Sequence, residues 1–266
     1  MEGIAGDGTI RVSGMTLEYR VFGPSFRAVP MIVMLHEGLG SVNAWGEFPL
    51  RLSERTGSRV FVYSRAGYGA SPPSDRLSVD YIRRHALDTL PAILDEISFQ
   101  RGILLGHSDG ASMVTAYAGT VKDSRLAGII AMAPHFIVES ETLAEIRNAR
   151  AAYQNKDLRQ RLSRYHADVD EAFWGWNNAW LDPAFAGFNL REELARIRVP
   201  MLVIRGADDR YGTDRQVSLA EELCHCPLQT LRIPGCGHIP HREEPEKVLD
   251  VIEAFYRKVV QIRGDS

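Results

Sequence analysis

Apolar residues along the chain form short continuous runs separated by longer segments in which apolar and polar residues mix. These runs are VPMIVMLH (29–36), SRVFVYS (58–64), RGILLG (101–106), LAGIIAMAP (126–134) and VPMLVIRG (199–206). Strands that are apolar on both faces belong to a parallel sheet that is covered by helices on each side. The pattern therefore predicts five buried strands at these positions.

The segments between these runs have the apolar spacing of helices. They lie at 47–57, 80–98, 111–121 and, after the last strands, 245–260. Near the start, TIRVSG and TLEYRVFG are β-rich and meet at Gly14, which indicates a hairpin or paired edge strands. The alternation of strands and helices predicts an α/β fold with a mostly parallel sheet flanked by helices.

One region interrupts this alternation, because residues 135–190 contain no strand pattern. Their sequence indicates several helices inserted between two core strands. An insertion at the carboxyl end of a parallel strand lies where open α/β sheets bind ligands. We therefore predict a helical cap at 135–190 on a core formed by 1–134 and 191–266.

The composition narrows the function classes. The chain has 266 residues, 45% hydrophobic and 24% charged, with a formal net charge of −3. It has no long basic run, which argues against nucleic acid or an anionic membrane as a partner. It also lacks a signal-peptide pattern at its start and any stretch of ~18 apolar residues. We expect a cytoplasmic protein that acts on a small molecule; its oligomeric state stays open.

Three cysteines add no further chemistry. Cys224, Cys226 and Cys236 are an odd number in a chain without signs of export, which argues against a disulfide framework. Cys224 and Cys226 flank His225, but the spacing of zinc sites is absent. We therefore expect no metal.

The strongest chemical motif is GHSDG at 106–110, which follows an apolar run and precedes a helical segment. Gly106 and Gly110 permit a tight strand-to-helix turn that exposes Ser108 at the edge of the sheet. A helix N-terminus at this point favours developing negative charge. The motif alone leaves two interpretations open, a catalytic nucleophile and a polar capping turn.

Serine is a weak nucleophile without a base that a carboxylate orients. His238 follows the last strand, and Asp208 and Asp209 follow the strand before it. The order Ser, Asp, His is the one expected for this turn. We predict Asp209, which lies deeper in the turn, as the acid and His238 as the base. His241 is a competing base that we expect to be exposed.

Acyl transfer also needs donors for an oxyanion. The backbone amide of Asp109 directly follows Ser108, and the loop after the first buried strand offers the amide of Gly38 or Leu39, of which we predict Gly38. Glu37 places a carboxylate beside this loop. It either points outward or forms a salt bridge, or it contacts a substrate.

Aromatic residues mark the predicted cap. Trp174, Trp176 and Trp180 are candidate substrate contacts, and Trp176 and Trp180 share a face if the segment is helical. The alternative is that these rings attach the cap to the core. We expect Arg65 and Tyr68 to be structural.

With these motifs in place, the chain resembles the α/β-hydrolase fold superfamily over nearly its whole length, in the group of lid-bearing serine esterases and C–C bond hydrolases. The matching segments are LHEGLG (35–40), YSRAGYGAS (63–71), GHSDG (106–110), RGADD (205–209) and GCGHIPHREEPEKV (235–248). The resemblance implies Ser108 as nucleophile, Asp209 as acid, His238 as base and the amides of Gly38 and Asp109 as oxyanion hole. It departs from the superfamily's common His-Gly pair at His36-Glu37.

We therefore expect hydrolysis of a carboxylic ester of a small apolar or aromatic substrate, without metal or organic cofactor. C–C cleavage of a meta-cleavage dienoic acid is the rival; such enzymes commonly have tryptophan after the histidine, where this chain has Ile239. Ser108 argues against dehalogenase and epoxide hydrolase chemistry, which uses an aspartate nucleophile. A ligand-binding receptor with slow turnover also stays open.

Overall fold

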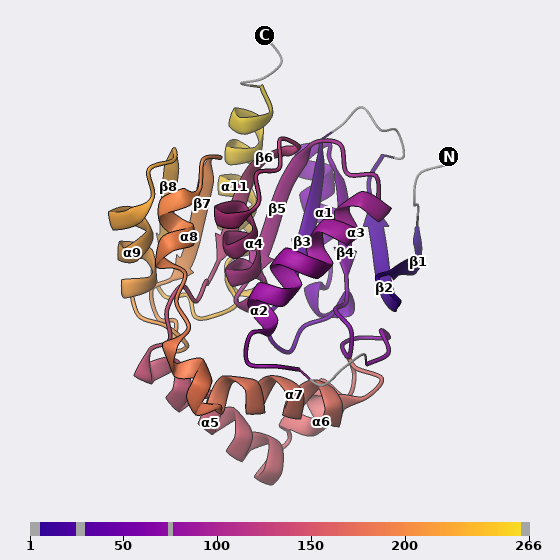
Figure 1. The fold of residues 1–266 in the computed structure, drawn as a ribbon, viewed down its shortest axis with the longest axis vertical. Coiled ribbons are helices and arrows are strands. Elements are labelled where there is room, and N and C mark those ends of the chain that lie inside the picture. Colours follow the sequence, from indigo (N-terminus) through magenta and orange to yellow (C-terminus); the bar gives the residue numbers. More distant parts are fainter. Residues whose placement is uncertain (1–5, 25–29, 74–76, 262–266) are drawn as a thin grey trace.

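The structure is a computed structural model that describes residues 6–24, 30–73 and 77–261. The described residues form an eight-stranded sheet in the order β1-β2-β4-β3-β5-β6-β7-β8 (Figure 1). The strands are β1 Asp7–Val12, β2 Met15–Phe22, β3 Met31–Leu35, β4 Arg59–Tyr63, β5 Gly102–His107, β6 Leu126–Met132, β7 Met201–Gly206 and β8 Leu228–Ile233. β2 pairs antiparallel with β1 and β4, and the other pairs are parallel. The predicted hairpin and mostly parallel sheet are confirmed; Val29, in the first predicted run, lies outside the described residues.

Helices follow the strands largely as the pattern predicts. They are α1 Phe48–Thr56, α2 Tyr81–Arg84, α3 Leu90–Glu96, α4 Asp109–Thr120, α5 Ser140–Asn155, α6 Leu158–Leu162, α7 Val169–Leu181, α8 Arg191–Arg196, α9 Arg215–Leu223, α10 Pro240–Glu243 and α11 Pro245–Gln261. The helix predicted at 80–98 contains a π-helical turn, His85–Thr89, between α2 and α3. Pro91 lacks the amide that would bond to the carbonyl of Leu87, which accounts for the altered ladder.

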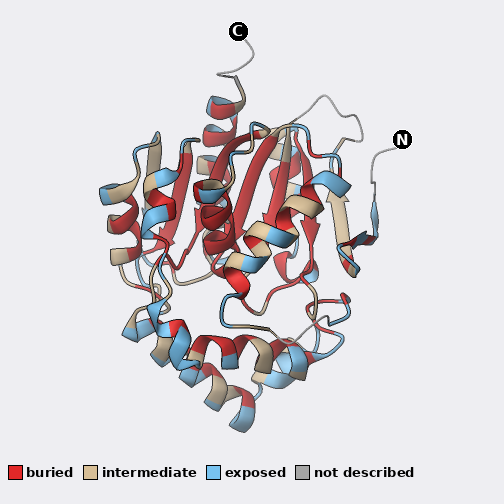
Figure 2. Ribbon diagram, in the orientation of Figure 1, coloured by how far each residue is buried: buried red, intermediate tan, exposed pale blue. Residues whose placement is uncertain are grey.

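The central strands β4, β3, β5, β6 and β7 are buried, as Figure 2 shows by the red strands in the centre of the sheet. Along β3, Val33 and Leu35 belong to one hydrophobic cluster, and Ile32 and Met34 belong to the other. The first cluster includes residues of α2, α3, α4, α8 and α9, and the second includes α1 and α11. Alternate side chains of each strand thus face opposite layers of helices, which explains the continuous apolar runs.

Helices α5, α6 and α7 lie together beyond one end of the sheet (Figure 1). They fall within residues 135–190, between β6 and β7 in the chain. A single antiparallel bridge between Ile137 and Asn189 joins the two ends of this segment. In the described part of the chain, no helix is long and apolar enough to cross a membrane.

Candidate active site

Ser108 lies in a sharp turn between β5 and α4. Its backbone has φ 53° and ψ −114°, a conformation that is rare for a residue with a side chain. A Cβ atom on Gly106 would lie 2.1 Å from the carbonyl oxygen of Gly110, and one on Gly110 would lie 2.2 Å from that of Leu35. The two glycines therefore allow the strand and helix to approach closely, and the tight turn predicted from GHSDG is present.

The turn brings Ser108 beside the predicted base and acid. His238 Nε2 lies 3.0 Å from Ser108 Oγ, and His238 Nδ1 lies 2.8 and 3.0 Å from the carboxylate oxygens of Asp209. Burial raises the pKa of Asp209, but hydrogen bonding and charge interaction with His238 outweigh it, so the pKa is lowered. An ionised carboxylate only accepts hydrogen bonds, so Nδ1 carries the proton and Nε2 is free to accept from Ser108.

The structure distinguishes the predicted acid and base from the candidates that lie next to them in the sequence. Asp208 is exposed, whereas Asp209 is the aspartate that meets His238. The expectation that His241 is exposed is wrong: its residue is only 4% exposed. Helix α10 begins at Pro240 and turns His241 inward, where its ring lies 4.7 Å from Trp45 and 5.0 Å from His107. Burial lowers the pKa of His241 well below its ordinary value.

Gly38 and Asp109 line the same cavity as Ser108, and their backbone amides make no hydrogen bond with the described residues. Asp109 is the first residue of α4, so its amide has no partner within the helix. The amide of Gly38 makes no hydrogen bond with the described residues. Both residues line the cavity together with Ser108 and His238. The arrangement is suited to binding an oxygen that gains negative charge.

The side chain of Asp109, to which the sequence interpretation assigns no role, is buried behind the nucleophile. Its carboxylate accepts hydrogen bonds from Tyr81 Oη and, at 3.2 Å, from Trp180 Nε1. Burial raises the pKa of Asp109, although the positive charge of Arg65 and these donors oppose the rise. The carboxylate therefore fixes the start of α4 and links it to α7.

Glu37 is paired and also faces the cavity. Its carboxylate lies 3.4 Å from His107 Nδ1, and its side chain is 26% exposed. Burial raises the pKa of Glu37, but the interaction with His107 outweighs burial, and the pKa falls well below its ordinary range. His107 in turn donates through Nε2 to the backbone oxygen of His238 at 2.8 Å. Glu37 therefore lies within ion-pair distance of His107, whose Nδ1 makes no hydrogen bond with the described residues, and next to the backbone of His238.

The cavity over Ser108 has a volume of about 430 Å³. Its apolar and aromatic walls come largely from the α5–α7 helices: Ile146, Leu158, Leu162, Tyr165, Trp176 and Trp180. Trp174 does not line this cavity, because its ring packs against Tyr153 and Phe173. The structure thus brings two of the three predicted tryptophans to the site and does not support substrate contact by Trp174.

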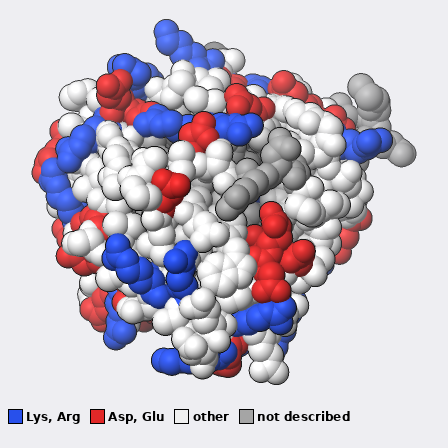
Figure 3. Space-filling view, turned by 60° about the horizontal axis from the view of Figure 1, so that its bottom comes forward, with Lys and Arg blue, Asp and Glu red and all other residues white. Residues whose placement is uncertain are grey.

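Three arginines also line this cavity. Arg161 has a carboxylate neighbour, Asp157, at 3.6 Å; Arg242 donates to the backbone oxygen of Ala44; and Arg164 makes no hydrogen bond or ion pair with the described residues. On the face of the molecule that carries α5–α7, basic and acidic side chains surround an uncharged central area (Figure 3). The cavity walls are therefore mostly apolar, and their charged side chains are three arginines and the carboxylates of Glu37 and Asp109.

Two residues beside His238 were not predicted from the sequence. The ring of Tyr211 lies 4.6 Å from the His238 ring, and the ring of His135 lies 5.7 Å from it. Burial lowers the pKa of His135 to about 3, so this ring is neutral near pH 7. Each residue follows the end of a predicted strand, but neither belongs to a recognisable motif. Only the strand-end position could have indicated them.

Arg65 supports the loop that contains Gly38. Its guanidinium donates to the backbone oxygens of His36 at 2.8 Å, Glu37 at 3.1 Å and Gly38 at 3.5 Å, and lies 4.7 Å from the centre of the Tyr68 ring. The backbone amide of Arg65 donates to His36 Nε2 at 3.0 Å. The expected structural role of Arg65 and Tyr68 is consistent with these contacts.

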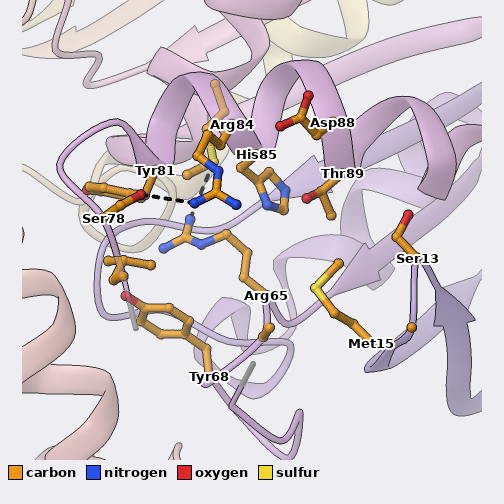
Figure 4. A pocket seen from close by; sticks show the side chains of 14 residues that line it. Ser13, Met15, Arg65, Tyr68, Ser78, Tyr81, Arg84, His85, Asp88 and Thr89 are labelled. Carbon is orange, nitrogen blue, oxygen red and sulfur yellow. Dashed lines mark hydrogen bonds between the residues drawn. The ribbon is translucent and has the colours of Figure 1, made fainter. Parts of the chain in front are cut away.

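A second cavity, of about 440 Å³, opens onto Arg65 from the side of α2 (Figure 4). Arg65, Tyr68, Tyr81, Arg84 and His85 all line it. Arg84 is exposed and donates to Ser78 Oγ at 3.4 Å, whereas Arg65 is buried. The two guanidiniums therefore share a cavity but differ in burial and in partners.

Comparison with known proteins places the chain in a family. Residues 32–251 match the family model described as "Alpha/beta hydrolase family", so the chain belongs to that family. It is 23% identical to 3-oxoadipate enol-lactonase 1 of Acinetobacter baylyi, over 92% of this chain and 95% of that protein. It is 19% identical to proline iminopeptidase of Lactobacillus helveticus, over 94% and 97%. The fold resembles naproxen esterase (carboxylesterase NP) from Bacillus subtilis, with a TM-score of 0.73 and 16% identity over 96% and 92% of the chains.

Replacement of Arg65 tests the support of the loop. Arg65→Met keeps much of the side-chain length but removes the donor to the buried carbonyl groups of His36 and Gly38, whereas the carbonyl of Glu37 keeps Gly40 N and His36 Nδ1 as donors. We expect the free energy of unfolding to fall by about 1–3 kcal/mol in urea titrations. Arg84→Gln, at the exposed arginine of the same cavity, is expected to change it by less than about 0.5 kcal/mol. Equal stability of wild type and Arg65→Met would contradict this role.

Buried histidines predict a pH dependence of stability. Burial lowers the pKa of His36, His85, His135, His166 and His241 below the ordinary value, for His85 and His135 to about 3. The unfolded chain therefore binds more protons than the folded one as pH falls through about 6.5, and stability is lost in that direction. Each such histidine contributes at most about 1.4 kcal/mol per pH unit.

We accordingly expect the free energy of unfolding in urea to be at least about 3 kcal/mol lower at pH 5.5 than at pH 7.5. Measurements at pH 7.5 and 8.5 provide the reference, since these five histidines titrate in neither state there. An unfolding free energy that does not change between pH 7.5 and pH 5.5 would show that they are not held neutral.

Proposed function

We propose that this protein is a serine hydrolase that cleaves a carboxylic ester through an acyl-enzyme on Ser108. The observation that carries the proposal is the continuous series of hydrogen bonds from Asp209 through His238 to Ser108, beside two open backbone amides. This is the arrangement that activates a serine for acyl transfer. Membership of the alpha/beta hydrolase family supports hydrolytic chemistry.

In the acylation step, Ser108 Oγ bonds to the carbonyl carbon of the ester while His238 Nε2 takes the serine proton. The electron pair of the carbonyl double bond moves to the oxygen, which the amides of Gly38 and Asp109 stabilise. The pair then re-forms the carbonyl, the bond to the alcohol oxygen breaks, and His238 returns the proton to the departing alcohol. Asp209 holds the imidazole in the required tautomer and stabilises its charged form.

In the deacylation step, His238 takes a proton from water as the water oxygen bonds to the acyl carbon. The same amides stabilise the second oxyanion. Its collapse breaks the bond to Ser108 Oγ, which regains its proton from His238, and the carboxylic acid leaves. The chain's own residues supply every proton transfer in this cycle.

The cavity suggests the kind of substrate. Its volume of about 430 Å³ and its apolar walls suit a small apolar or aromatic group. We propose that residues 135–190 form a helical cap that shapes this space over a core of 1–134 and 191–266. Trp176 and Trp180 are the proposed aromatic contacts of the cap, and Glu37 is the proposed polar contact near the ester.

The central test compares the wild type with Ser108→Ala in the hydrolysis of short p-nitrophenyl esters, and maps a fluorophosphonate label by peptide mass. We expect the wild type to turn over and to carry the label on Ser108. We expect Ser108→Ala to lose at least ~10³-fold in kcat and all labelling, because the hydroxyl that bonds to His238 Nε2 is removed. Ser140→Ala, at an exposed serine on α5, is the matched control and is expected to resemble the wild type.

An active Ser108→Ala variant would contradict the proposed role of Ser108 as the nucleophile. A wild type that neither hydrolyses esters nor takes the label would contradict the ester-hydrolase function itself. In that case, measuring C–C cleavage and ligand binding without turnover would be the next step.

The arginines of the cavity predict a preference among esters. Arg161, Arg164 and Arg242 outnumber the two carboxylates that line the same cavity, those of Glu37 and Asp109, and only Arg161 has a carboxylate neighbour, Asp157 at 3.6 Å, among the described residues. We expect an ester with a terminal carboxylate to have a kcat/KM about 3- to 10-fold above that of its neutral counterpart of equal length. The advantage should shrink at 0.5 M salt and in Arg164→Gln. A neutral ester preferred at all salt concentrations would contradict this prediction.

A further inference from the structure

Two tryptophans of α7 contact Gly38 and Asp109, which line the cavity. A Cβ atom on Gly38 would lie 2.1 Å from Trp176 Nε1, so the indole packs directly on this glycine. Trp180 Nε1 donates to the carboxylate of Asp109 at 3.2 Å. Since Trp176 and Trp180 are one helical turn apart, one face of α7 contacts both Gly38 and the side chain of Asp109.

The indole N–H of Trp176 has no partner of its own. Trp176 is only 6% exposed, and its Nε1 makes no hydrogen bond with the described residues, whereas Nε1 of Trp180 has Asp109. Trp176 lines the cavity together with Ser108 and Gly38. Nε1 is not among the fully buried side-chain polar atoms of the described residues that lack a partner, so this donor is accessible from the cavity and available to an acceptor on a bound molecule. The cavity in which the ester carbonyl would bind is where that acceptor can come from.

We propose that Trp176 is a further catalytic residue, whose indole N–H is a third donor to the carbonyl oxygen of the substrate as that oxygen becomes an oxyanion. The inference rests on the proposed acyl-enzyme function. The indole keeps its proton throughout, and it strengthens one hydrogen bond as charge develops on the oxygen. A donor that acts on the transition state more than on the ground state raises kcat.

The contact also explains why residue 38 is glycine. A methyl group at Gly38 would overlap both Nε1 and, at 2.5 Å, Cδ1 of Trp176. The space that a side chain would fill is occupied by the indole of Trp176, which also lines the cavity over Ser108. Trp176 and Gly38 therefore form one unit, built from the α5–α7 segment and the loop after β3.

The test compares Trp176→Phe, which removes the N–H and keeps an aromatic ring, with Trp174→Phe. Trp174 is on the same helix but packs against Tyr153 and Phe173, away from the cavity. For p-nitrophenyl esters we expect Trp176→Phe to lower kcat by about 10- to 100-fold with KM within about threefold. We expect Trp174→Phe to leave both constants within about twofold.

A boronic acid that forms a tetrahedral adduct with Ser108 distinguishes the loss of a hydrogen bond to the oxyanion from a loss of packing in Trp176→Phe. Its affinity should weaken in Trp176→Phe by the same factor as kcat/KM, while the affinity of the alcohol product stays unchanged. If Trp176→Phe does not fold, the wild type labelled with ¹⁵N at its indoles provides the test. The Trp176 N–H resonance should shift downfield when the adduct forms, as expected for a new hydrogen bond to an anionic oxygen.

Three outcomes would overturn the inference: an unchanged kcat in Trp176→Phe, a rise in KM alone, or an indole resonance that the boronate leaves in place. The first two, with an active wild type that labels on Ser108, leave the proposed function intact. An inactive wild type without labelling would overturn the proposed function and this inference together.

Discussion

The structure depends on the close approach of β5 and α4 at the turn that contains Ser108. Gly106 and Gly110 pack against backbone carbonyl groups at distances that no Cβ atom tolerates, and Ser108 takes a positive φ between them. The carboxyl ends of the parallel strands then meet at one edge of the sheet, so the loops after β7 and β8 bring Asp209 and His238 to this serine. A relaxed turn would move Ser108 away from His238 Nε2.

The second constraint on the structure is that charged side chains lie at this edge of the sheet, where they are largely shielded from water. Asp209 is paired with His238, and Glu37 lies beside His107. Arg65 is balanced by backbone oxygens and the face of Tyr68. Each buried charge thus has a partner that also positions a backbone segment of the proposed site. The contacts that compensate these charged groups for the loss of water therefore also hold the proposed catalytic groups in place.

Much of this arrangement could be predicted from the sequence, because it follows from local rules. Continuous apolar runs identify the buried strands, and the spacing of glycine and serine in GHSDG identifies the turn. His241 was predicted incorrectly, since its burial depends on the direction in which α10 leaves the loop. Packing across distant segments was equally invisible: no local pattern shows that Trp180 reaches Asp109, that Trp174 turns away from the cavity, or that His135 and Tyr211 flank His238.

The central claim is that a covalent acyl group forms on Ser108, and its most direct measurement is rapid quenching of the wild type during turnover of p-nitrophenyl acetate, followed by peptide mass spectrometry. We expect an early burst of p-nitrophenol and a transient acetyl group on the peptide that contains Ser108. Steady turnover without a burst and without acetylation of this peptide, together with incorporation of ¹⁸O from labelled water into Asp209, would contradict an acyl-enzyme on Ser108. The carboxylate of Asp209 would then be the nucleophile.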